Sequence, residues 1–190
     1  YYNSIQYSKE LKLSDSHIDK NKQLAKLNQF DVTIRGSYLS TVITIEQLIR
    51  DIISYHFCPD EAKRKQFVSL ILNSNRNYIF SYGIDILEKI LILHYADLIQ
   101  QYPKLINELR KIRNYLNWLA HSMLDTSEEF LAKGLTDTIR LISYGDNGET
   151  NYRELTRTEI DERLEDCISV HFMLVYIRME VRERVLSNNV

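Results

Sequence analysis

Glycine and proline are unusually scarce in this chain. Only five glycines and two prolines occur among its 190 residues, whereas these two residue types together usually make up roughly 12% of a protein. A β-sandwich or β-barrel needs many tight turns, which glycine and proline supply, so their scarcity disfavours those folds and favours long helices. The sequence therefore predicts an all-α protein.

The rest of the composition is that of an ordinary globular domain. Hydrophobic residues make up 44% of the chain and charged residues 26%, which argues against disorder. A chain of this length has the size of one domain and can bury roughly 70% of its unfolded surface. The formal net charge is −2. This excludes a protein that coats DNA through general positive charge, so any nucleic-acid contact must come from a local patch.

The sequence contains no segment that resembles a secretory signal or a membrane span. Residues 1–10 lack a basic start and an apolar core, and the densest apolar stretch, residues 171–177, is far shorter than the roughly 20 residues that cross a bilayer. The two cysteines, Cys58 and Cys167, cannot form a disulfide framework. We therefore expect a cytoplasmic protein that makes no membrane contact.

Apolar spacing and capping signals predict a single helical domain over residues 14–190, preceded by an arm over residues 1–13. An Asn-Gly turn at Asn147 predicts one small β-hairpin over about 138–155, before the last helix. Thr156 and Glu159 have the spacing of a capping box, which predicts the start of that last helix. Helices are expected over residues 16–30, 31–57, 60–72, 80–101, 103–124, 126–133 and 156–186, with a polar loop over 73–77.

The predicted helix over residues 103–124 carries a polar flank beside its apolar face. At 100° per residue, six apolar side chains fall within about 80° of one another and form a core-facing seam. Arg113, Asn117 and His121 follow one another at four-residue spacing on the adjacent flank, so they stack along one side of the helix. The seam comprises Leu105, Leu109, Ile112, Leu116, Leu119 and Met123, and the flank comprises Arg110, Arg113, Asn114, Asn117 and His121.

Arginine and histidine side by side suit phosphodiester chemistry. Histidine can move protons near neutral pH, and arginine can stabilise the negative charge that develops on phosphorus. The local charge is favourable, because Lys104, Arg110, Lys111 and Arg113 are opposed by a single Glu108. The ordinary alternative is a solvated flank in which Arg113 pairs with a nearby carboxylate.

The stretch Leu109–Ser122, LRKIRNYLNWLAHS, resembles the end of the third core helix of HEPN domains, whose mark is an Arg, often Arg-Asn, followed by four to six residues and a His. Two further segments support the resemblance. Arg35–Leu39 leading to Glu46 is similar to the first HEPN core helix, and Phe80–Gly83 leading to Lys89 is similar to the next. The resemblance covers about residues 31–125 and implies a HEPN-like helical bundle.

The resemblance implies a metal-independent endoribonuclease, of bacterial toxin or phage-defence type, that needs no cofactor. His121 would be the general acid or base and Arg113 would stabilise the transition state, while Asn114, Asn117, Arg110 and Lys111 would bind RNA. It also implies a homodimer in which two such flanks face each other, and an antitoxin or defence-complex protein as a further partner. The alternative within the family is a non-catalytic RNA-binding or dimerisation module in a larger complex.

The motif departs from the family pattern in its spacing. Seven residues separate Arg113 from His121, one more than the usual maximum. If Asn117 and His121 are aligned with the common Arg-Asn-x-x-Ala-His form, Leu116 occupies the Arg position, so either Arg113 replaces it or the site is degenerate. Some toxin members carry Tyr two residues after the His, where this chain has Met123.

A structural zinc site is a weaker possibility. His56, Cys58, Cys167 and His171 have the right number of ligands for zinc, but neither pair has the spacing of a zinc finger. Cys167 and His171 share a helix face with Leu164, which favours a buried pair. We therefore expect no metal site.

Overall fold

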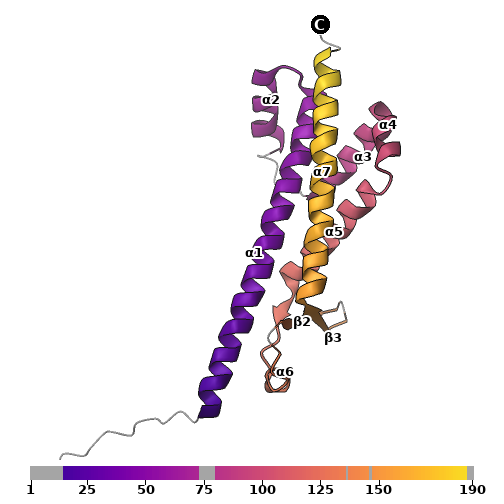
Figure 1. Ribbon diagram of the computed structural model, residues 1–190. Helices are drawn as coiled ribbons and strands as arrows, with labels where there is room; N and C mark the ends of the chain where they lie inside the picture. Colours follow the sequence, from indigo (N-terminus) through magenta and orange to yellow (C-terminus); the bar gives the residue numbers. More distant parts are fainter. Residues whose placement is uncertain (1–14, 73–79, 136, 146, 188–190) are drawn as a thin grey trace, which may run out of the picture.

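The computed structural model describes residues 15–72, 80–135, 137–145 and 147–187. This part of the chain is mostly helical and contains a small antiparallel sheet (Figure 1). It confirms a predominantly helical protein, although the sheet has three strands rather than the two of a hairpin. No helix among the described residues is both long and apolar enough to cross a bilayer. The predicted arm and the predicted polar loop lie outside the described residues.

The first helix, α1, runs without interruption from Asp15 to Phe57. The predicted division between residues 30 and 31 is therefore wrong. A hydrogen bond crosses this point, because Thr33 donates its hydroxyl to the Gln29 carbonyl. Without a proline or a helix-ending glycine here, the backbone ladder has no reason to stop.

The elements after α1 form a short helix and then a hairpin of helices. Helix α2 (Glu61–Phe67) is capped by the Asp60 side chain, and one π-helical turn, η1 (Val68–Leu72), follows it. The apolar segment predicted as one helix over 80–101 is two helices, α3 (Phe80–His94) and α4 (Ala96–Gln101). The chain bends at Tyr95, whose backbone leaves the helical conformation (φ −140°, ψ 50°) and whose side chain is buried.

Helix α5 (Leu105–His121) runs back along α3 and leads into the sheet. Its predicted end at residue 124 is wrong, because Ser122 adopts an extended backbone and β1 (Met123–Leu124) pairs with β2 (Thr138–Tyr144). Strand β2 then pairs with β3 (Thr150–Thr156), as the hairpin prediction required. The short helix α6 (Glu128–Leu131) between β1 and β2, predicted over residues 126–133, is capped by Ser127.

The last helix, α7, extends from Arg157 to Ser187. The predicted capping box is confirmed, since the Glu159 amide donates to the Thr156 hydroxyl and the Thr156 amide donates to the Glu159 carboxylate. Helices α1 and α7 run side by side in the same direction, from the sheet to the opposite end of the bundle (Figure 1). The core lies between α1, α3, α5 and α7 and includes the fully buried Tyr38, Ile45, Leu87, Leu109 and Leu174.

Candidate functional site

The polar flank of α5 lies along the last three turns of the helix. Asn117 and His121 are exposed and Arg113 is partly buried. Residues at four-residue spacing lie above one another on a helix, so all three side chains project from the same side. Arg113 and His121 are eight residues apart, which places their Cα atoms roughly 12 Å apart along the axis.

Asn114 determines where the Arg113 guanidinium points. The Asn114 side-chain oxygen accepts hydrogen bonds from Arg113 Nε and Nη2, at 3.2 and 2.8 Å. A neutral amide orients the guanidinium without cancelling its charge. The positive charge of Arg113 is thus held beside Asn114 and remains available to an anion.

Arg110 lies on the same flank, but its charge is already compensated. Its guanidinium is 2.7 Å from a Glu88 carboxylate oxygen and 3.4 Å from one of Asp85, both on α3. These two carboxylates raise the pKa of Arg110 above its usual value. The contact fastens α5 to α3 and removes Arg110 as a free cation for phosphate.

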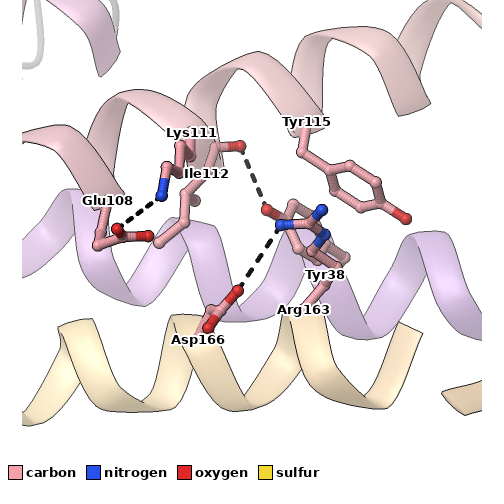
Figure 2. A pocket seen from close by; sticks show the side chains of 7 residues that line it. All are labelled: Tyr38, Glu108, Lys111, Ile112, Tyr115, Arg163 and Asp166. Atoms are coloured by element: carbon pink, nitrogen blue, oxygen red, sulfur yellow. Dashed lines mark hydrogen bonds and ion pairs between the residues drawn. The ribbon is translucent and has the colours of Figure 1, made fainter. Parts of the chain in front are cut away.

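The structure does not bring Lys111 to this flank. Lys111 bonds to Glu108 at 2.8 Å and faces α7, on the other side of α5. Figure 2 shows it at a small cavity of about 10 Å³, where Tyr38 of α1, Tyr115 of α5 and Arg163 of α7 meet. A cavity of this size holds no more than one water molecule.

The contacts of the two tyrosines indicate that this cavity is a small gap where three helices pack together. The Tyr38 hydroxyl donates to the Ile112 carbonyl at 3.2 Å, and the Tyr38 and Tyr115 rings meet edge to face at 4.9 Å (Figure 2). Burial raises the pKa of both tyrosines, so they stay protonated. We conclude that Lys111 belongs to the contact between three helices.

An open groove borders the flank on its apolar side. It lies between α1 and α5, has a volume of about 210 Å³, and is lined by Arg35, Leu39, Leu116, Leu119 and Ala120. Leu116, predicted to be buried in the seam, is only partly buried here. Met123, also assigned to the seam, is 52% exposed, because the helix has ended and the residue belongs to β1.

Arg35 is a residue at this site that the sequence did not single out for a role. Its Nη1 donates to the Leu119 carbonyl in the last turn of α5, and its Nε is 2.9 Å from Asp31. Arg35 therefore ties α1 to the end of α5 that carries His121. The available signal was the Asp31–Arg35 pair at four-residue spacing within the first HEPN-like segment.

Asp125 anchors the chain just after His121. Burial would raise the pKa of this carboxyl, but hydrogen bonds from Ser127 and Arg140 hold it below its usual value. Arg140 Nε is 2.5 Å from the Asp125 carboxylate, and the Asp125 amide donates to the Arg140 carbonyl. These bonds hold the segment that follows β1 against β2, four residues after His121.

The cysteines and histidines considered for zinc do not come together. His56 and Cys58 lie at the end of α1, whereas Cys167 is buried on α7, where burial raises its pKa to about 11. Within the described part of the chain, no three His, Cys, Asp or Glu side chains are placed to hold a metal ion.

No family model, no curated protein and no solved structure matches this chain.

Proposed function

We propose that this protein has a HEPN-type fold and is a metal-independent endoribonuclease. The observation that carries the proposal is the placement of Arg113 and His121 on one side of α5, with the histidine exposed and an open groove beside them. The resemblance of Leu109–Ser122 to the HEPN motif supports the same assignment. Because the proposed reaction requires a 2′-hydroxyl, the substrate is RNA and not DNA.

In the proposed reaction the RNA 2′-hydroxyl attacks the adjacent phosphorus. The 2′-oxygen loses its proton, the bond from phosphorus to the 5′-oxygen breaks, and that oxygen takes up a proton. His121 transfers protons and Arg113 stabilises the charge on the phosphoryl oxygens. Asn114 orients Arg113, and Asn117, between the two, contacts the RNA backbone.

The proposed site requires two copies of the chain. Arg113 and His121 of one copy are about 12 Å apart along α5, so a phosphate shared between them lies at the limit of the reach of both side chains. If two flanks face each other across a two-fold axis, the arginine of one copy approaches the histidine of the other. The cleft then holds two of each residue.

Incubation of the purified protein with total RNA in EDTA tests the activity. We expect cleavage that leaves 5′-hydroxyl ends, loss of cleavage in His121→Ala, and unchanged cleavage in His94→Ala, an exposed histidine on α3. His121→Ala should keep the wild-type melting temperature because the side chain is exposed. A His121→Ala protein that cleaves at the wild-type rate overturns the role of this residue.

The second candidate function is a non-catalytic RNA-binding or dimerisation module. The eight-residue separation of Arg113 and His121 and the compensated charge of Arg110 favour it. In that case RNA remains intact under every condition, and any RNA binding weakens in Arg113→Ala but not in His121→Ala.

A further inference from the structure

The outward side of α1 between Val32 and Gln47 carries no exposed charge. All residues of this stretch are described, and each of its nine exposed positions is apolar, small or a neutral polar residue. The two charged residues of the stretch are only partly exposed and are paired, Arg35 with Asp31 and Glu46 with Arg50. We call the nine positions the neutral face. They are Val32, Thr33, Gly36, Ser37, Leu39, Ser40, Ile43, Thr44 and Gln47.

Hydroxyl groups on and beside the neutral face are already hydrogen-bonded within α1. Thr33 donates to the Gln29 carbonyl at 2.8 Å, Thr41 to Ser37 at 3.0 Å, and Thr44 to Ser40 at 3.1 Å. Burying an unpaired hydroxyl is costly, but these donors keep their acceptors when water leaves. The neutral face can therefore be covered by another surface with little penalty from its threonines.

Gly36 lies on this face, and no contact among the described residues requires a glycine there. Its φ is not positive, and a Cβ added to it meets nothing within 4 Å. Glycine in the middle of a helix is less stable than alanine. No described neighbour requires the missing side chain, and the bare backbone at Gly36 leaves room for another surface to approach the helix closely.

Grooves and protruding apolar side chains border the face on both sides. On one side is the groove against α5 that lies beside Arg113 and His121. On the other is a groove of about 340 Å³ against α7, formed by Ser40, Thr44 and the partly exposed Ile168 and Phe172. Phe172 is 66% exposed and Leu39 is 48% exposed, so each groove has an apolar side chain at its rim.

We infer that the occupant of the neutral face is a second copy of this chain, packed with the two α1 helices antiparallel across a two-fold axis. A face without charge gives RNA no cation to bind, whereas it meets its own copy without charge repulsion. In the antiparallel arrangement, the two α5 helices lie opposite each other on one side of the α1 pair, and the two α7 helices lie opposite each other on its other side. Phe172 of each copy then packs near the groove between α1 and α7 of the other.

This arrangement deepens the proposed function, because it names the surface that brings two α5 flanks together. The nine positions, with Leu116, Ala120, Ile168 and Phe172, are fewer than the roughly 20–30 residues per side of a standard interface. We therefore expect reversible association with a dissociation constant of about 1–100 μM.

Sedimentation velocity of the full chain without RNA, at concentrations up to about 200 μM, tests the inference. Ser40→Glu places a charge at the middle of the face and opposite its own copy. We expect it to raise the dissociation constant by at least about tenfold. Ser187→Glu, the same change at the exposed end of α7, should leave association unchanged. Circular dichroism verifies that both variants are folded.

Gly36→Ala provides a second test, which distinguishes a role of Gly36 in the dimer from a role in the fold of one chain. The added methyl group has free space in one copy, so the melting temperature of the monomer should rise by about 2–4 °C. The same methyl group should hold the two helices apart and weaken the dimer. A more stable monomer with weaker association supports the inference.

Two results would overturn it: a wild-type chain that stays monomeric throughout the concentration range, or a Ser40→Glu variant that dimerises as well as the wild type. Neither result depends on RNA cleavage. A dimer that is lost in Ser40→Glu but never cleaves RNA supports this interface and contradicts the proposed endoribonuclease. Cleavage by a strictly monomeric protein contradicts this interface and the two-copy site, but it agrees with the endoribonuclease activity itself.

Discussion

Leu116 lies at the edge of the groove between α1 and α5, whereas Leu109, two turns earlier on the same helix, is completely buried. Truncation of Leu109 to alanine leaves a cavity and should cost about 2–5 kcal/mol of unfolding free energy. Leu116→Ala should cost only about 1 kcal/mol, because its side chain is already partly in water. Urea unfolding at concentrations that keep the chain monomeric compares the two. Equal costs would show that Leu116 is enclosed within one copy.

Individual residues show which features of the site can be predicted from the sequence and which cannot. Helical spacing places Arg113, Asn117 and His121 on one flank, and the structure has them there. The spacing cannot reveal side-chain partners, so it did not anticipate that Arg110 is neutralised by Glu88 or that Lys111 faces α7. Those contacts depend on how α3 and α7 pack against α5, which a helical projection of α5 alone does not contain.

At the scale of elements, one buried ion pair holds the segment between β1 and α6 against β2. The side chains of Asp125 and Arg140 are 2% and 12% exposed. Asp125→Ala leaves the arginine without its partner and should cost about 3 kcal/mol, or about 6–12 °C in melting temperature. Glu129 also pairs with Arg140, at 3.4 Å, but its side chain is 80% exposed. Glu129→Ala should therefore change the stability by less than about 1 kcal/mol, and a comparable loss in both variants would contradict this assignment.

The elements also differ in whether local sequence signals are sufficient to predict them. Local signals were sufficient for α7 and for the β2–β3 hairpin, since a capping box and an Asn-Gly turn act within a few residues. The bend at Tyr95 and the strand β1 depend on distant contacts. At the bend the Tyr95 side chain is buried, and β1 forms by the pairing of Met123 with Ile142 of β2.

For the whole molecule, we expect stability to fall as the pH drops below about 6.5, the usual histidine pKa. Burial and the nearby His94 lower the pKa of His56. The His56 and His94 rings are 4.6 Å apart, and His56 Nδ1 is 3.3 Å from the Tyr95 hydroxyl oxygen. The folded chain resists protonation here while the unfolded chain accepts it, so acid favours unfolding.

Melting temperatures at pH 7.5 and 5.5 measure this effect. The melting temperature of the wild type should fall more between these two pH values than that of His56→Asn, because asparagine cannot accept a proton at this position. Other groups titrate in the same range, so the difference between the two proteins is the informative quantity. The same pH dependence in both would exclude His56 as the cause.

The uninterrupted α1 has a mechanical consequence for the molecule. Its 43 residues form a rod about 65 Å long. Near one end Lys20 and Gln23 contact α6 beside the sheet, and at the other end His56 contacts α3 and α4. A helix bends only gently, so a tilt of about 5° around its centre moves each end by about 3 Å in opposite directions. A tilt of α1 would therefore move its sheet end and its far end in opposite directions, with the neutral face near the centre of rotation.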